Sequence, residues 1–470
     1  MAFSTAEQLG PKPPAVGPRG LPFVGASLQF RRDPTGFLLH LARVCGDLVE
    51  FRLMGCPAFF FGHPDYVREI LVTRQANFTK SRILQRARLL LGEGLLTNEG
   101  ESHLRQRRLV QPAFYHQRLQ SYAEIITTYT LRARERFEPQ TELDILDEMM
   151  RLTLSIVAKA LFSTDAEGDA SAVSQALDHV EDRFRFLLLP FSDLLTWLPL
   201  PPTRRFERAK AVLDRTVYRI IRERRAASGA SADLLSALLA ARDEEGSAMT
   251  DEQVRDEVLT LFLAGHETTA IGLTWTWYLL AQNPHCEQRL HDEIDGVLHG
   301  RAPRFDDIPS LRYTEMVLAE SMRLYPPVWT IGRMPKEAFE LAGVTIPQGA
   351  ICLMSQFVMH RDPRFYPDPE RFDPERWHPD IRESRPKFAY FPFGGGARLC
   401  IGERFAWMEM ILVLATLCQK WRFLLVDDQP VGLKPLITLH PDRSIQMLAE
   451  PRERSTENET MTGEGDREDR

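Results

Sequence analysis

One cysteine, Cys400, lies in a sequence context that makes it a candidate metal ligand. Residues 391–402 read Phe-Pro-Phe-Gly-Gly-Gly-Ala-Arg-Leu-Cys-Ile-Gly, and the stretch from about 403 to 420 has a helical pattern. Consecutive glycines let the backbone approach a neighbouring group closely. Because a helix N-terminus favours thiolate over thiol, we expect a lowered pKa for Cys400. A thiolate suits a soft metal site, whereas a lone cysteine after a flexible loop is more often a buried, inert thiol.

The residues around this cysteine resemble the cysteine loop of the cytochrome P450 family of haem-thiolate monooxygenases, Phe-x-x-Gly-x-Arg-x-Cys-x-Gly. The match falls on Phe393, Gly396, Arg398, Cys400 and Gly402. The resemblance implies that Cys400 is the proximal ligand of a heme b iron, where its thiolate favours O–O cleavage. It also implies that Phe393 packs beside the sulfur and that Arg398 pairs with a haem propionate.

A second candidate site lies in the middle of a long apolar segment, residues 251–282. Thr250 and Gln253 form a capping box at its start, and Asn283-Pro284 ends it. Roughly 32 residues at 1.5 Å each give a helix of about 48 Å. Because its middle is apolar nearly all round, we expect this helix to be buried.

Residues 264–269 within it read Ala-Gly-His-Glu-Thr-Thr. Taken alone, they are either a buried polar cluster bonded to its own backbone or a carboxylate and hydroxyl that hold water and pass protons. The segment resembles the oxygen-activation motif of the same family. The resemblance implies that Glu267 is the acid, that Thr268 is the alcohol, and that the pair delivers protons to bound oxygen. Ala264 and Gly265, being small, would leave room over the iron.

Three further residues resemble structural positions of the family. Glu320 and Arg323 share one face of a helix predicted over about 311–324, which alone would indicate a surface ion pair. They resemble the family's Glu-x-x-Arg pair, and Arg376 would be its third member, followed by Trp377 where phenylalanine is usual. The resemblance implies that these residues hold the cysteine loop and perform no chemistry.

Basic residues elsewhere are candidates for holding haem propionates. His103 and Arg107 resemble the family's Trp-x-x-x-Arg segment, with histidine in place of tryptophan, and Arg333 stands where another propionate arginine is common. Arginine suits such a contact because its guanidinium binds a carboxylate with two parallel hydrogen bonds. Without the resemblance, a basic helix face in solvent would explain the first segment.

The resemblance implies a mainly α fold with a small β region, the triangular prism of the cytochrome P450 family, with haem between the long central helix and the helix after the cysteine loop. Residues 47–62 predict two strands around a turn at Gly55. We expect a Pro-rich lead-in over 1–20, a single catalytic domain over 21–448, and a disordered tail over 449–470, where charge leaves too little apolar surface to bury.

Composition limits which binding partners and which cellular compartment we expect for this protein. With 58 Lys and Arg against 65 Asp and Glu, the net charge of −7 argues against nucleic-acid binding. We expect no signal peptide, no transmembrane segment and no disulfide framework, hence a cytoplasmic protein, and a monomer. No flavin- or nicotinamide-binding unit is visible after residue 450, so electrons would come from a separate ferredoxin or flavodoxin with its reductase. Its docking would use exposed arginines: Arg105, Arg108, Arg118 and Arg404.

The expected substrate, besides O2, is a small apolar molecule that is hydroxylated or epoxidised, with a lipid, fatty acid or terpenoid favoured. Candidate pocket residues are Leu263, Ala264, Val328 and Trp329. The apolar segment from Phe184 to Leu200 is either ordinary core or a pocket roof that touches lipid.

Two other functions stay open on the residues alone. One is a haem-thiolate enzyme that uses peroxide or rearranges its substrate, and the other is a haem sensor without turnover. The presence of Glu267 and Thr268 favours the monooxygenase, since peroxide-using relatives usually lose this pair.

Overall fold

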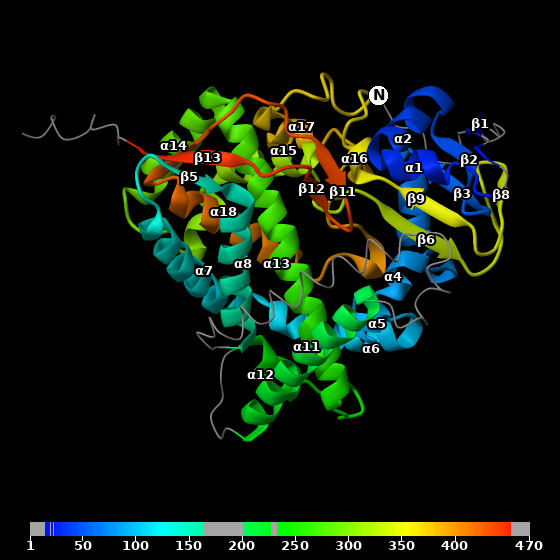
Figure 1. The fold of residues 1–470 in the computed structure, drawn as a ribbon, viewed down its shortest axis with the longest axis horizontal. Coiled ribbons are helices and arrows are strands. Elements are labelled where there is room, and N and C mark those ends of the chain that lie inside the picture. Colours follow the sequence, from blue (N-terminus) through cyan, green and yellow to red (C-terminus); the bar gives the residue numbers. More distant parts are fainter. Residues whose placement is uncertain (1–14, 19, 22, 163–200, 227–232, 453–470) are drawn as a thin grey trace, which may run out of the picture.

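A helical body lies beside a smaller β-rich region (Figure 1). Each has its own hydrophobic cluster, and Tyr325 and Leu433 pack against both. The computed structural model describes residues 15–452 except 19, 22, 163–200 and 227–232. The architecture confirms the expected mainly α fold with a small β region. Residues 1–14 of the lead-in, residues 453–470 of the tail and the segment from Phe184 to Leu200 lie outside the described residues.

The elements of the described residues have the following bounds. The helices are α1 Ser27–Arg32, α2 Pro34–His40, α3 Pro64–Arg68, α4 Arg82–Arg86, α5 Arg88–Leu91, α6 Gly100–Val110, α7 His116–Arg136, α8 Ile145–Phe162, α11 Pro201–Ala226, α12 Leu234–Ala240, α13 Asp251–Gln282, α14 Pro284–Leu298, α15 Arg312–Leu324, α16 Gln356–Met359, α17 Pro379–Arg382 and α18 Glu403–Leu417. The strands are β1 Ala15–Val16, β2 Leu48–Leu53, β3 Cys56–Phe61, β4 Phe78–Lys80, β5 Thr141–Asp144, β6 Ile331–Pro335, β7 Phe339–Leu341, β8 Val344–Ile346, β9 Ile351–Met354, β10 Trp421–Leu425, β11 Leu433–Pro435, β12 Leu439–Pro441 and β13 Gln446–Pro451.

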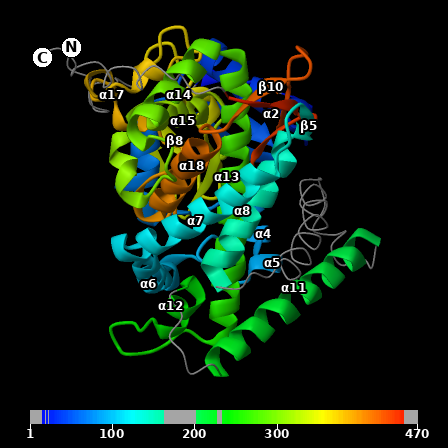
Figure 2. The ribbon, with the colours of Figure 1, turned by 90° about the vertical axis from the view of Figure 1, so that its left-hand side faces the viewer.

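Helix α13 is the central element of the helical body, and Figure 2 shows α8 lying along it. Its bounds agree with the prediction, and the capping box is formed: the Gln253 amide donates to Thr250 Oγ1 (3.2 Å) and the Thr250 amide to Gln253 Oε1 (3.0 Å). Trp275 and Trp277 are fully buried in the core that α13 shares with α7, α8, α15 and α18. None of the described helices is long and apolar enough to span a bilayer.

The main sheet has the strand order β1-β2-β3-β9-β6-β4. Strands β2 and β3 form the predicted hairpin, with Gly55 in the left-handed region at φ +76°. Strands β4 and β6 pair at the opposite edge, where Lys80 lies directly across from Arg333. This register places two cations side by side, with consequences for the site described below.

The boundary of the charged tail was predicted wrongly by four residues, since Arg452 is also ordered and its amide donates to the Lys420 carbonyl at 2.9 Å. Ala449, Glu450 and Pro451 belong to β13, which pairs with β10, and Ala449 is fully buried. Composition suggested a tail because the following residues are charged, but backbone pairing with a distant strand orders these three.

Candidate active site around Cys400

The loop before α18 turns back on itself and fixes the position of Cys400. Gly396 has φ +68°, and a Cβ there would lie 1.9 Å from the Leu71 carbonyl oxygen, so only glycine fits. The Cys400 amide donates to the Phe393 carbonyl at 3.0 Å and closes the loop. The three-glycine sequence is therefore required by close packing as well as by the turn.

Cys400 lines an internal space rather than the outer surface. It is accessible to solvent-sized molecules, yet it lies deep enough that desolvation raises the pKa of its thiol. The expectation of a lowered pKa was wrong for the protein alone, because burial outweighs the favourable Gly402 amide and Arg107. Coordination to a metal deprotonates a thiol outright, so this burial does not oppose ligation. Phe393 packs on Trp407 of α18, with ring centroids 6.0 Å apart.

Helix α13 contributes an accessible position, Ala264, in a half-buried stretch. Ala264 is exposed and residues 263 and 265–268 are half-buried, whereas Phe262 and Thr269 on either side are buried. Leu263 packs on the same hydrophobic cluster as Ile401, the residue after Cys400. The helix and the cysteine loop are thus joined by this cluster, and each presents one small accessible residue.

Gly265 has a different role from the one expected. A Cβ there would come within 3.2 Å of the Val157 side chain of α8. Its small size therefore permits close packing of α13 on α8 and does not provide room over an iron, which leaves that role to Ala264.

The acid and the alcohol of α13 do not bond to each other. Thr268 Oγ1 donates to the Ala264 carbonyl one turn earlier, at 2.6 Å. Glu267 Oε1 accepts hydrogen bonds from Thr438 and from His440 Nε2, the latter at 2.9 Å. Burial raises the pKa of Glu267, but these two hydrogen bonds outweigh it and hold the pKa below its usual range. The sequence analysis missed both partners, which lie more than 170 residues away.

A group of basic side chains, some buried and some half-buried, lies beside the cysteine loop. Arg107 Nη1 donates to the Leu399 carbonyl at 2.7 Å, and Arg398 forms an ion pair with Glu99. Lys80 Nζ, which the sequence analysis did not identify, donates to the carbonyls of residues 95 (3.0 Å) and 98 (2.7 Å). We call Lys80, His103, Arg107, Arg333 and Arg398 the basic cluster.

The pKa values in the basic cluster are lowered, which indicates that positive charge is in excess there. Burial, reinforced by Arg398, lowers the pKa of Lys80 to about 7. Burial, reinforced by Lys80, lowers the pKa of His103 to about 3, and burial lowers that of Arg333 to about 10. Lys80 and Arg333 are also cross-strand neighbours, an arrangement that is destabilising for like charges. Among the described residues, Glu99 forms an ion pair with Arg398, and Glu257, whose pKa burial raises to about 7, is a second carboxylate near Lys80. Two carboxylates, one of them readily protonated, therefore face four cations.

These residues fit a haem. A porphyrin carries two propionates, which would supply the missing negative charge to the basic cluster. No group of three or more His, Cys, Asp or Glu among the described residues could hold a metal ion. An iron at Cys400 must therefore bring most of its ligands with it, as it does in a porphyrin.

The predicted structural residues meet in a fully buried network. Arg323 bonds both carboxylate oxygens of Glu320 at 2.8 Å, and neither side chain is exposed. Arg376 forms an ion pair with Glu320 at 3.3 Å. The Trp377 indole N–H also donates to Glu320, at 2.9 Å, so tryptophan in place of phenylalanine adds a hydrogen bond. The interpretation as a surface ion pair is excluded.

The candidate pocket residues divide into two groups. Leu263 and Val328 are half-buried and Ala264 is exposed, as expected of residues that border an internal space. Trp329 instead packs in the core beneath the sheet and donates its indole N–H to the Leu436 carbonyl at 3.0 Å. Its assignment to the pocket was wrong, because the ring is needed to join two segments.

Two of the arginines expected to dock an electron donor are already paired. Arg105 bonds Asp243 at 2.7 Å and Arg108 bonds Glu244 at 2.8 Å. Arg404 is exposed at the start of α18. The positive charge available beside the cysteine loop is therefore smaller than the sequence suggested.

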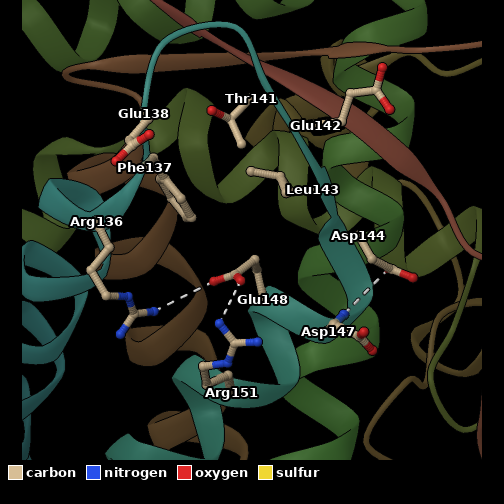
Figure 3. Close-up of a pocket in the computed structure, with 10 residues that line it drawn as sticks. All are labelled: Arg136, Phe137, Glu138, Thr141, Glu142, Leu143, Asp144, Asp147, Glu148 and Arg151. Atoms are coloured by element: carbon tan, nitrogen blue, oxygen red, sulfur yellow. Dashed lines mark hydrogen bonds and ion pairs between the residues drawn. The ribbon is translucent and has the colours of Figure 1, made fainter.

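A surface pocket of about 310 Å³ between α7, β5 and α8 contains none of the candidate site residues (Figure 3). Glu148 accepts hydrogen bonds there from Arg136 (3.5 Å) and Arg151 (2.8 Å). Both of its arginines pair with Glu148 and it holds no candidate site residue, so we assign it no chemistry.

Comparisons with known proteins extend over nearly the whole chain. A family model described as Cytochrome P450 matches residues 14–447. Cyclooctatin synthase of Streptomyces melanosporofaciens is 41% identical over 93% of this chain and 95% of its own length. Pentalenene oxygenase of Streptomyces avermitilis is 38% identical over 92% of this chain and 96% of its own.

More distant relatives agree in fold. Leukotriene-B4 omega-hydroxylase 3 of Mus musculus is 33% identical over 89% of this chain and 83% of its own length. The solved structure of cyanobacterial CYP120A1 with retinoic acid bound superposes with a TM-score of 0.84, at 27% identity, over 94% of this chain and 99% of that one.

Proposed function

Since the chain belongs to the cytochrome P450 family, it is a haem-thiolate monooxygenase of apolar substrates, and we propose that its substrate is a terpenoid hydrocarbon and that Cys400 is its iron ligand. The observation that carries the assignment of Cys400 is its position: an accessible sulfur on an internal wall, beside buried cations that lack enough carboxylates.

The residues of this chain supply binding, positioning and protons. Bound at Cys400, heme b supplies the activation of O2 for insertion of one oxygen atom into a C–H or C=C bond. Arg107, Arg333, Arg398 and Lys80 would hold the propionates and so fix the plane of the ring. The Thr268 hydroxyl, bonded to the Ala264 carbonyl, presents its oxygen to the internal space, and Glu267 holds a carboxylate next to it in the sequence.

The substitution Cys400→Ser tests the ligand. We expect the wild-type reduced carbonyl complex to show the red-shifted Soret band of thiolate ligation and the variant to lose it. Cys352→Ser is the matched control, because Cys352 is buried in the sheet. A variant at position 400 that kept the band would show that another cysteine is the ligand.

The terpenoid assignment is supported by the two Streptomyces relatives, whose names refer to cyclooctatin and pentalenene. The mouse relative is named for a fatty-acid derivative and supports the alternative. Titration of the haem protein with pentalenene and with dodecanoic acid separates them, since a ligand that displaces water shifts the spin state. We expect the terpene to bind at least tenfold more tightly, a difference of about 1.4 kcal/mol; tighter binding of the acid would contradict the proposal.

We further propose a cytoplasmic monomer that takes electrons from a separate ferredoxin or flavodoxin. Substrate-dependent consumption of NADH with a surrogate ferredoxin and its reductase tests the electron source. Product formed only with hydrogen peroxide would identify a peroxide-using enzyme instead. Size-exclusion chromatography with light scattering measures the oligomeric state.

A further inference from the structure

The segment that reaches Glu267 is held rigidly. The Leu439 amide of β12 donates to the Pro327 carbonyl at 3.0 Å, and the Leu439 carbonyl accepts from Trp275 Nε1 at 2.8 Å. Leu439 is also fully buried. Because both backbone groups of Leu439 are occupied, the side chains before and after it have fixed directions.

Those two side chains converge on one carboxylate oxygen. Side chains alternate along a strand, so Thr438 and His440 point to the same side, opposite Leu439. Thr438 Oγ1 and His440 Nε2 both donate to Glu267 Oε1, and neither uses Oε2. Oε1 is thus the carboxylate oxygen that faces the β12 segment.

We propose that His440 acts through Glu267 as the group that passes protons to it; this inference rests on the proposed function. The exposed fraction of the His440 side chain is 11% and that of Glu267 is 19%. Both groups are thus partly accessible, and their contact joins α13, which also carries Ala264 and Thr268, to the hairpin β11–β12, where Lys434 and Ile437 are exposed.

The transfer balances with water as the only co-reactant. The Nε2–H bond of the His440 imidazolium breaks and an O–H bond forms on Glu267 Oε1, leaving a neutral imidazole and a neutral carboxyl group. The imidazole regains a proton from solvent. A neutral carboxyl group is no longer held to His440 by charge and can rotate to donate toward the Thr268 side.

The charged and titratable groups around His440 come from three segments. From α13, Glu267 faces it directly and His266 lies next to Glu267. From β11, Lys434 lies directly across from His440 in the strand register and is exposed. Asp442, which follows β12, accepts a hydrogen bond from the Gly432 amide at 2.9 Å. Glu267 is therefore the charged group that the structure places in hydrogen-bond contact with His440.

The test compares His440→Gln, which can still donate a hydrogen bond but cannot ionise, with His440→Lys, which can do both. The readout is NADH oxidation by the haem protein with a surrogate ferredoxin in the absence of substrate, where O2 reduction still consumes protons. We expect about tenfold slower turnover and a larger solvent isotope effect for His440→Gln, and recovery in His440→Lys. Lys434→Gln is the matched control, since it removes a charge from the same hairpin.

A second readout does not depend on turnover. Because the His440 bond holds the pKa of Glu267 down, the infrared band of its protonated carboxyl group should appear at higher pH in His440→Gln than in the wild type. Glu267→Gln identifies the band by removing it. This titration tests the contact between His440 and Glu267 in solution, whereas the solvent isotope effect tests the passage of protons, which a merely structural role would leave unchanged.

The possible failures are distinguishable. A wild-type protein without the thiolate Soret band refutes the proposed function. A normal wild type with His440→Gln unchanged in isotope effect and infrared titration overturns this inference. The inference is also overturned if Glu409→Gln slows turnover and His440→Gln does not. Glu409 is a fully buried carboxyl group beside Thr269 that could bring protons from α18 instead.

Discussion

Two buried ionic clusters in this protein use the same residue types in opposite ways. Around Glu320, two arginines share one carboxylate, and the remaining N–H groups of Arg323 donate to backbone carbonyls, including His360 at 2.9 Å and Pro369 at 2.6 Å. In the basic cluster, Lys80 and Arg333 lie directly opposite each other and bond to backbone carbonyls.

The difference teaches how to separate a structural cluster from a binding site. Both arginines of the Glu320 network contact its carboxylate directly, and removing Arg323 leaves that carboxylate without a bidentate partner. We call this network the complete cluster. Among the described residues, Lys80 and Arg333 bond to backbone carbonyls and form no ion pair, so a bound anion would stabilise them. The pKa of Lys80, lowered to about 7, indicates this surplus of positive charge, whereas the Glu320 network has its opposite charges in direct contact.

The largest effect is expected in the complete cluster. Arg323→Leu leaves Glu320 buried without its two main hydrogen bonds, which should lower the free energy of unfolding by about 3–5 kcal/mol. Urea unfolding followed by circular dichroism measures it. Arg219→Leu, in an exposed pair with Glu223, should cost at most about 1 kcal/mol. Equal losses in both variants would contradict the comparison.

In the basic cluster, a similar substitution should lower the affinity for haem more than the stability of the folded apoprotein. Arg333→Leu removes one of two opposed cations, so the apoprotein should unfold at an equal or higher urea concentration. Haem affinity should fall by about 2 kcal/mol, roughly thirty-fold, because a propionate loses a charged partner. Hemin titration of the apoprotein measures the affinity. A less stable apoprotein with unchanged haem affinity would assign Arg333 to the structural class.

The indole of Trp377 offers a smaller test of the complete cluster. Trp377→Phe removes a hydrogen bond to a charged group, and we expect a loss of about 1.5–3 kcal/mol in unfolding free energy. Trp277→Phe is the control, since its buried indole N–H has no hydrogen-bond partner among the described residues. Subtracting the two values isolates the hydrogen bond from the change of volume; a difference near zero would show that the indole contributes packing alone.

The smallest effect is a dependence on pH. The folded apoprotein holds the pKa of Lys80 near 7, below the value of 10.5 in an unfolded chain. Between these values the unfolded chain binds more protons, so stability should rise with pH, by at most about 1.4 kcal/mol per unit for one proton. Lys80→Met should flatten this rise between pH 7 and 9 in urea midpoints. Parallel curves for the two proteins would show that Lys80 is not desolvated.

The sequence alone determined the local features of the site. The loop around Cys400 and the capping box of α13 are each set by neighbouring residues, since turns and helix ends depend on local backbone chemistry. The motif also indicated that Glu320 and Arg323 are structural. That role followed from the resemblance to the family's Glu-x-x-Arg pair, because residue types and helical spacing alone predicted a surface ion pair.

The tertiary structure decided what those residues face. Lys80 opposes Arg333 through strand register, and His440 meets Glu267 because β12 is fixed against α13. Gly265 faces α8 and Trp329 faces the core, against expectation. Strand register and helix rotation follow from packing over long sequence separations, so no local pattern contains them. Charge balance in a buried site is therefore a property of the folded chain.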